Sequence, residues 1–413
     1  MTMRIGFSRR EITPPLGVEL GGYAGYRPCG GVHDPLWCKA VVLEDRGRKY
    51  ALVAMDLLSV DESLAQATAR ALEPLGICGA VVSAIHTHAS PCGIVPGEGP
   101  LARVNRVGDS NPELFLEYTD SLINAAVAAC RKAAEQLETF RVRVGRGVAP
   151  IIGSERHTGE NPELTMTALE CRTDSGRKLI LWQIPCHPTV MGPGNLLASA
   201  DFAGGVEALL DADMAVFLNG AAGDISTRFT RREQTFDECA RMGSVAAEAV
   251  RSLLAAAEFT DPGAFRVKTA AVTLKCRPVE DPLKAQKTLD EAVERWQAAE
   301  DADPMAKRLL RSLVEGAGVS LEFSHTLAGT TELFLPVTVF SFAGLKFATV
   351  PGELYSTLWR CDAVPICYAN GYYRYIAGAD AYDAGHYEAM AAILARGQGE
   401  VFVKELEKLL NLI

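Results

Sequence analysis

A buried strand that ends in two histidines is encoded by Val81-Val82-Ser83-Ala84-Ile85-His86-Thr87-His88. The apolar and β-branched run before the histidines is typical of a strand that is covered on both faces. Because side chains two positions apart on a strand share a face, His86 and His88 are expected to point to the same side. Ser90-Pro91 then opens the strand into a loop, where sites are usually built. A surface His-x-His pair without a role is the alternative, but a metal site is the better reason for such a pair.

Other strand ends place polar side chains in a similar way. The strand predicted at 179–184 ends at Pro185-Cys186-His187-Pro188, where the prolines fix the backbone around the imidazole. A third strand, 346–350, leads into Pro351-Gly352-Glu353. Taken alone, His187 would more often be structural than a metal ligand. Two histidines and one glutamate together form a common catalytic zinc shell, with one position left for water or substrate.

The strand predicted at 215–218 runs into a loop of small residues at 219–226, Asn-Gly-Ala-Ala-Gly-Asp-Ile-Ser. Such a loop lets backbone N–H groups approach a ligand closely, so Asn219, Gly223 and Asp224 are candidate substrate contacts and Ser226 is the nearest hydroxyl. The loop matches neither a phosphate-binding loop nor a G-x-S-x-G elbow. A tight turn that caps a helix is the alternative interpretation.

Strands and helices alternate along the chain, as read from apolar β-branched runs and from amphipathic stretches. The expected strands are 40–43, 50–55, 80–85, 179–184, 215–218, 333–342 and 346–350, and the expected helices are 62–75, 112–137, 236–257 and 382–410. This order predicts an α/β fold in which mixed β-sheets and flanking helices form a single large catalytic domain over 1–413. The charged stretch 281–318 predicts a helical hairpin or lid-like insertion, with a solvated pair of surface helices as the alternative.

The composition excludes several classes of protein. Of the 413 residues 48% are hydrophobic and 22% charged, which is ordinary for a globular protein. The net charge of −10, without any basic block, argues against a nucleic-acid binder. No segment approaches the ~20 apolar residues of a membrane span and no signal peptide is visible, so a cytoplasmic protein without integral membrane association is predicted. The eleven cysteines include no C-x-x-C pair, so reduced thiols are expected, and a metal would use histidine and oxygen ligands.

Taken together, these segments resemble the neutral, non-lysosomal ceramidase family of zinc amidohydrolases. Each segment is weak alone, but their order along essentially the whole chain makes the resemblance specific. The segments are 6–15 (GFSRREITPP), 20–23 (LGGY), 32–36 (VHDPL), 83–91, 199–202 (SADF), 219–226, 351–353 (PGE) and 370–375 (NGYYRY) with Tyr387. The resemblance implies a neutral-ceramidase-like fold in a short, bacterial-type chain. The secretion leader and the C-terminal β-sandwich domain of secreted members are expected to be absent.

The resemblance also implies roles for individual residues. One zinc ion per chain would be held by His86, His187, Glu353 and Tyr375. His88 would contact the metal-bound water or the substrate, and Ser226 corresponds to the family's proposed nucleophile. Tyr387 would be the second active-site tyrosine, and Arg156 matches an active-site arginine in the loosest part of the alignment.

The expected activity is cleavage of an N-acyl amide bond in a small-molecule or lipid substrate. Zinc would polarise the carbonyl, and Ser226 or zinc-bound hydroxide would be the nucleophile. The family commonly has Pro-Asn after its serine, whereas Thr227-Arg228 follows Ser226 here, and Arg228 favours a polar or anionic substrate. A small polar amide, lactam or ester therefore competes with ceramide as the substrate.

Two other classes of function and the oligomeric state stay open at this point. The chain could be a non-catalytic binding protein on the same fold. A two-metal phosphoesterase would use Asp34, Asp56 and Asp201, which otherwise would cap turns or hold a ligand imidazole. The sequence does not distinguish a monomer from a homo-oligomer.

Overall fold

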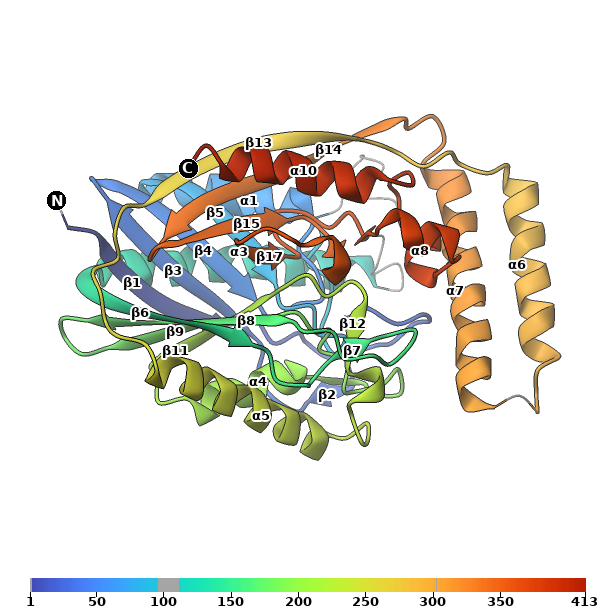
Figure 1. The fold of residues 1–413 in the computed structure, drawn as a ribbon, viewed down its shortest axis with the longest axis horizontal. Helices are drawn as coiled ribbons and strands as arrows, with labels where there is room; N and C mark the ends of the chain where they lie inside the picture. The colour runs from blue at the N-terminus through green and yellow to red at the C-terminus, as the bar shows by residue number, and fades with distance from the viewer. Residues whose placement is uncertain (1, 96–110, 302) are drawn as a thin grey trace.

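The computed structural model describes residues 2–95, 111–301 and 303–413 (Figure 1). Within these ranges eight strands form one mixed sheet in the order β11-β9-β8-β6-β1-β3-β4-β5. Its two outer pairs, β11–β9 and β4–β5, are parallel, and the pairs between them are antiparallel. The strands are β1 (Arg4–Glu11), β3 (Trp37–Asp45), β4 (Arg48–Met55), β5 (Ile77–Ala84), β6 (Glu138–Val148), β8 (Thr165–Thr173), β9 (Lys178–Ile184) and β11 (Met214–Asn219).

Much of this sheet is buried on both faces, which explains why parts of β3, β9 and β11 are apolar at successive positions. In β3, Ala40 and Val42 belong to one hydrophobic cluster, whereas Val41 between them belongs to another. The first face is covered by helices α1 (Glu62–Leu72), α3 (Pro112–Glu135), α4 (Asp201–Leu209) and α5 (Phe236–Ala255). Helix α3 begins as its sequence predicts, because the Asn111 side chain accepts a hydrogen bond from the Leu114 N–H.

A second sheet packs on the other face. Four further strands of the described chain pair in the order β13-β14-β15-β17, with bounds Arg266–Lys275, Glu332–Phe342, Leu345–Val350 and Val364–Cys367. Phe340 and Phe347 of this sheet stack on each other and pack in one cluster with Phe7 and Val41 of the first sheet. Helix α10 (Gln398–Leu410) lies over the second sheet (Figure 1).

The curl of the large sheet brings its two edges together. Adjacent strands twist by roughly 20–25° each, so seven steps accumulate roughly 140–175°. Strands β11 and β5, at opposite edges, contact each other, and β17 contacts both. If the sheet were flat, β5 and β9 would run in opposite directions and their ends would lie far apart. The accumulated twist turns the two edges toward each other, so the segments that follow β5 and β9 can meet.

Several short elements build the rim around these strand ends. Three two-stranded pairs join distant loops, two 3₁₀ turns closely follow strands of these pairs along the chain, and a third turn connects α1 to the start of β5. The pairs are β2 (Gly31–Val32) with β10 (Leu197–Ala198), β7 (Ser154–Glu155) with β12 (Ile225–Ser226), and β16 (Glu353–Leu354) with β18 (Tyr375–Ile376); the turns are η1 (Glu73–Leu75), η2 (Thr227–Phe229) and η3 (Ser356–Leu358).

A pair of helices stands at one end of the molecule, at the right of Figure 1. These helices, α6 (Pro282–Gln297) and α7 (Pro304–Thr326), connect β13 to β14 and contact each other. Helix α6 is mostly exposed, whereas α7 buries Phe323 and contacts helix α9 (Tyr387–Met390). Helix α7 thus extends eight residues beyond the predicted end at 318.

The predicted α/β class and all seven predicted strands are confirmed. The single helix expected over 382–410 is wrong, because this region contains α8 (Ala379–Asp383), α9 and α10 instead. Gly385, with a φ of 67°, follows the end of α8 in a left-handed conformation that stops a helix, and Gly397, with a φ of 83°, is the N-cap of α10. None of the helices in the described ranges is both long and apolar enough to span a bilayer.

Candidate metal centre

Two imidazoles are held in a fixed tautomer at the strand ends. His86 follows β5, and its Nδ1 donates a hydrogen bond to the Leu58 carbonyl at 2.8 Å. His187 follows β9, and its Nδ1 lies 2.7 Å from the Ala222 carbonyl and 3.0 Å from the Ile225 carbonyl. Because a carbonyl only accepts hydrogen bonds, Nδ1 carries a proton in both rings, and Nε2 is the ring atom that is turned toward the centre.

The two Nε2 atoms face one carboxylate oxygen. Glu353 Oε2 lies 2.9 Å from His187 Nε2 and 3.4 Å from His86 Nε2. Atoms bound tetrahedrally to zinc at ~2.0–2.1 Å are ~3.3 Å apart, so these separations fit a zinc ion. All three side chains are buried, and burial lowers the pKa of His187 to about 4, which keeps it neutral as a metal ligand must be. The donor set therefore fits a zinc ion.

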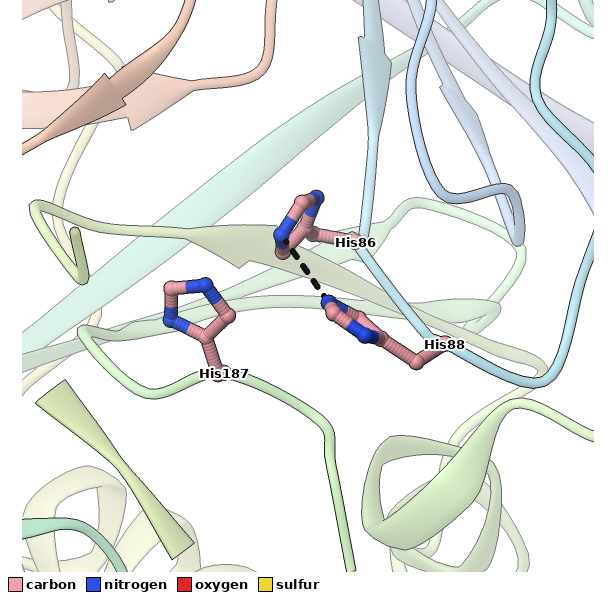
Figure 2. A group of neighbouring side chains, drawn as sticks. All are labelled: His86, His88 and His187. Carbon is pink, nitrogen blue, oxygen red and sulfur yellow. Dashed lines mark hydrogen bonds between the residues drawn. The ribbon is translucent and has the colours of Figure 1, made fainter. Parts of the chain in front are cut away.

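His88 belongs to the same group of side chains (Figure 2). Its Nε2 lies 3.3 Å from His86 Nε2, and the possible ligand atoms of His86, His88 and His187 all lie within 4.8 Å of one another. The sequence predicts that His88 lies beside the metal rather than on it, and this assignment stays a prediction. Gly22 lies against the ring, since a Cβ there would be 2.5 Å from His88 Cγ.

The backbone around the centre is strained. His86 has a φ of 69°, and Tyr368, whose ring stacks on His86 at 4.0 Å, has a φ of 56°. Arg374, next to Tyr375, has a φ of 53°. Such conformations cost ~1–3 kcal/mol each in non-glycine residues and cluster at functional sites. Their grouping supports a functional role for this end of the sheet.

A small parallel ladder sets Tyr375 beside Glu353. In the pairing of β16 with β18, Glu353 and Tyr375 occupy the same register position. The phenol that donates to the carboxylate is nevertheless Tyr372, whose hydroxyl lies 2.6 Å from Glu353 Oε1. The Tyr375 hydroxyl instead lies 3.2 Å from Arg156 Nη1. Tyr375 is thus adjacent to the centre, and its role as a zinc ligand stays a prediction.

Arg156 is oriented by a buried acid that sequence reasoning did not identify. Arg156 Nη1 lies 3.1 Å from Glu388 Oε1, and Glu388 Oε2 lies 2.8 Å from His157 Nε2. Although burial opposes ionisation, Arg156 and His157 lower the pKa of Glu388 to about 2, so this carboxylate is charged. His386, which received no predicted role, stacks on His157 at 3.7 Å. The only signal for Glu388 in the sequence is its position after Tyr387.

Ser226 is held beside His187. Strand β12 pairs with β7, and an isolated bridge joins Ser226 to His187. The Ser226 hydroxyl accepts a hydrogen bond from the Arg228 N–H at 3.4 Å, and no side-chain base in the described ranges hydrogen-bonds to it. Tyr387 packs edge-on against Tyr375, with ring centroids 5.9 Å apart.

The site residues surround a cavity of about 720 Å³. Side chains of helix α7, including Arg308, Leu309 and Val319, form part of its wall. The inserted helical segment therefore contributes directly to the predicted binding space. The predicted site residues that line the cavity are His86, His88, Arg156, Ser226, Glu353, Tyr375 and Tyr387.

The three predicted substrate contacts are not among the described residues that line this cavity. The Asn219 amide bridges the Ile85 and Cys186 carbonyls at 3.1 and 3.2 Å, and thereby ties two strand ends together. Asp224 accepts hydrogen bonds from the backbone and hydroxyl of Ser356. Gly223 allows close approach, because a Cβ there would lie 2.6 Å from the Glu353 carbonyl. Direct contact of these residues with substrate stays a prediction.

The aspartates considered for a two-metal site bind backbone and hydroxyl groups instead. Asp34 accepts from the Ser199 hydroxyl at 2.6 Å, and Asp56 accepts from the Trp37 N–H at 2.9 Å. Asp201 accepts from the N–H groups of three residues. They are not among the described cavity-lining residues, so the geometry gives no support to a two-metal phosphoesterase. The ligand imidazoles are held by backbone carbonyls, not by these carboxylates.

Comparison with solved structures identifies the fold as that of the neutral ceramidases. The chain is similar to neutral ceramidase from Pseudomonas aeruginosa with a TM-score of 0.74 and 18% identity, over 99% of this chain and 73% of that one. A ceramidase solved in complex with C2 gives a TM-score of 0.71 and 16% identity, over 97% of this chain and 74% of the other. No family model matches the sequence, and no curated protein matches it. The predicted neutral-ceramidase-like fold is confirmed.

Proposed function

We propose that this protein is a zinc-dependent amidohydrolase that cleaves an N-acyl amide bond. One observation carries the proposal: His86 Nε2, His187 Nε2 and Glu353 Oε2 face one another, and two of these residues, His86 and Glu353, line the cavity. Two imidazole nitrogens and a carboxylate oxygen at these separations form a donor set that zinc prefers. The ceramidase fold supports the choice of an amide as the substrate.

Zinc held by His86, His187 and Glu353 would supply Lewis-acid polarisation of the amide carbonyl. Tyr375 and Arg156 line the same cavity, and both carry donors for a carbonyl oxygen that gains negative charge. Glu388 keeps the Arg156 guanidinium in place through the 3.1 Å ion pair. His88 is the candidate to carry a proton from the nucleophile to the leaving amine at Nε2.

Ser226 and a water molecule are the two candidate nucleophiles. Direct attack by Ser226 would require a base that removes the proton of its hydroxyl. The described contacts of this hydroxyl include the Arg228 N–H but no side-chain base, which favours a positioning role for Ser226. Rapid-quench analysis of Ser226→Ala distinguishes the two routes, because residual turnover without a covalent acyl intermediate supports water as the nucleophile.

Metal content and turnover test the proposed function together. The full chain, purified without chelators, is expected to hold about one zinc ion and to hydrolyse members of a panel of N-acyl amides that includes ceramide. His86→Ala is expected to lose both zinc and turnover. His325→Ala is the matched control, since His325 is exposed on α7 and is not among the described residues that line the cavity.

Two outcomes would contradict the proposal. Full turnover in protein that contains no zinc would exclude the metal mechanism. Stoichiometric zinc without hydrolysis of any amide, combined with measurable binding of the same compounds, would identify a binding protein on this fold. The cytoplasmic location and the oligomeric state stay predictions, to be tested by cell fractionation and by light scattering.

A further inference from the structure

The cavity wall is positively charged, although the chain as a whole has a net charge of −10. Among the described residues, six arginines and three glutamates line the cavity. They are Arg156, Arg228, Arg231, Arg308, Arg311 and Arg374, with Glu315, Glu353 and Glu388. A bound zinc ion would make the balance more positive still. A concave site with this excess of positive charge concentrates anions.

Most of these arginines have an acidic partner. Arg156 pairs with Glu388, and both Arg308 and Arg311 pair with Glu315, at N–O distances of 3.1 to 3.3 Å. These pairs account for the two glutamates that do not face the metal centre. The acidic side chains of the cavity wall are therefore already engaged.

Arg228 and Arg231 differ from the others. Arg228 Nη1 donates to the Arg156 carbonyl at 2.7 Å, and Arg231 Nη1 donates to the Thr189 carbonyl at 2.6 Å. Neither guanidinium forms an ion pair with a carboxylate in the described ranges. Both groups are partly buried, and although Asp201 and Glu388 attract them from a distance, a partly buried charge without a directly paired carboxylate is destabilising.

The surroundings of Arg228 add to this cost. Its pKa falls to about 10, first because of burial and then because Arg156, Arg308 and Arg231 repel its charge, while Glu388 offsets part of this effect. These cations therefore lie close enough to act on one another. An anion placed between them would relieve that repulsion and supply the missing acceptor atoms.

We propose that the substrate is an acidic N-acyl amide, whose carboxylate or phosphate group is bound by Arg228 with Arg231 and Arg308 beside it. This inference rests on the proposed amidase function and names its substrate class. Arg228 lies two residues after Ser226, and its backbone N–H contacts the Ser226 hydroxyl. The anionic group therefore lies near the scissile amide, and a guanidinium can bind it through two parallel hydrogen bonds.

Hydrolysis of matched substrates tests the proposal. One pair is an N-acyl glycine and its neutral carboxamide, and the other is an N-acyl ethanolamine phosphate and the corresponding alcohol. At low ionic strength, kcat/KM of the full chain is expected to be about 10-fold or more higher for one acidic member than for its neutral counterpart. Which pair shows the preference distinguishes a carboxylate from a phosphate.

Substitutions then test the assigned residue. Arg228→Gln is expected to reduce the acidic-to-neutral ratio of kcat/KM by about 10-fold, and Arg228→Lys is expected to reduce it less. Arg251→Gln is the matched control, because Arg251 pairs with Glu248 on the surface of α5, outside the described cavity wall. An unchanged ratio in Arg228→Gln would overturn the assignment.

A binding measurement separates this inference from the proposed function. The probes are a ketone isostere of the N-acyl glycine, which cannot be hydrolysed, and its carboxamide, titrated into the full wild-type chain by calorimetry. The acid is expected to bind about 10-fold more tightly or better, with an affinity that falls as salt is added. Equal affinities for acid and carboxamide, and equal hydrolysis within both substrate pairs, would overturn the inference and leave the amidase proposal intact. Tight, salt-sensitive binding without any hydrolysis would instead contradict the amidase proposal alone.

Discussion

Gly22 and Gly25 offer a matched pair of substitutions that tests the placement of His88. Both glycines lie in the same loop with a φ of 91°. A Cβ at position 22 would lie 2.5 Å from both Cγ and Nδ1 of His88, whereas a Cβ at position 25 would meet no atom within 4 Å. Gly22→Ala therefore displaces His88 and strains the backbone, and Gly25→Ala only strains the backbone.

The size of both effects follows from the structure. An ordinary contact of a Cβ atom is at least 3.4 Å, so the His88 ring must move by ~0.9 Å in Gly22→Ala. A displacement of ~1 Å at a catalytic group lowers the rate by ~100-fold. The left-handed backbone costs an alanine ~1–2 kcal/mol at either position. In a 413-residue chain, with an unfolding entropy of ~2.1 cal/mol/K per residue, this cost lowers Tm by ~1–2 °C.

Three measurements on the purified variants decide the outcome. Steady-state kinetics on the best N-acyl substrate gives kcat/KM, calorimetry gives Tm, and elemental analysis gives the zinc content. We expect Gly22→Ala to lose ~100-fold in kcat/KM and to keep its zinc, and Gly25→Ala to lose only stability. Wild-type kcat/KM in Gly22→Ala would refute a catalytic role for His88 in the observed position. Loss of zinc in Gly22→Ala would show that His88 is a metal ligand.

Two further predictions concern metal affinity and pH. Tyr372→Phe removes the buried hydrogen bond to Glu353 and is expected to weaken zinc binding by ~10–100-fold in a chelator competition. Tyr373→Phe is the control, because it loses contacts to Glu62 and Phe334 instead and should bind zinc as tightly as wild type. Equal zinc affinities of Tyr372→Phe and wild type would contradict the role of Tyr372. Burial raises the pKa of Asp56 from 3.8 to about 6 in the folded state, so wild type gains stability as pH falls from about 6 toward 3.8. Asp56→Asn should abolish this gain of ~1.4 kcal/mol between pH 8 and pH 5, so its Tm relative to wild type is expected to be higher at pH 8 than at pH 5 by ~1.6 °C; a pH-independent difference would contradict the assignment.

Several of the strands that sequence reasoning predicted are buried on both faces. Strands β9 and β11 are apolar at nearly every position, because helices cover one side and the second sheet covers the other. Strands β6 and β13 were not predicted, because arginine or lysine side chains interrupt their apolar runs. The pattern of a strand with one solvated face is shorter and weaker, so such strands are harder to recognise.

The candidate site shows the same division. His86, His187 and Glu353 were identified because each follows an apolar run that ends at a turn, which is a local property. Tyr372 and Glu388 were not assigned, because nothing in their local sequence distinguishes a buried hydrogen-bonding partner from a packing residue. The bridging role of Asn219 could not be predicted either, because the two strand ends that it joins lie more than 30 positions away in the sequence.

The amino-acid sequence by itself determined seven of the strands, several of the turns, and which imidazoles and carboxylates stand at strand ends. These properties depend on side-chain periodicity, prolines and helix caps within a few residues. Only the tertiary structure decided that His187 and Glu353, 166 positions apart, meet with His86. It also decided that backbone carbonyls hold both imidazoles and that Arg228 forms no ion pair with a carboxylate in the described chain. The physical reason is that convergence depends on the accumulated twist of the large sheet and on the packing of the second sheet and α7 against it, which no local segment specifies.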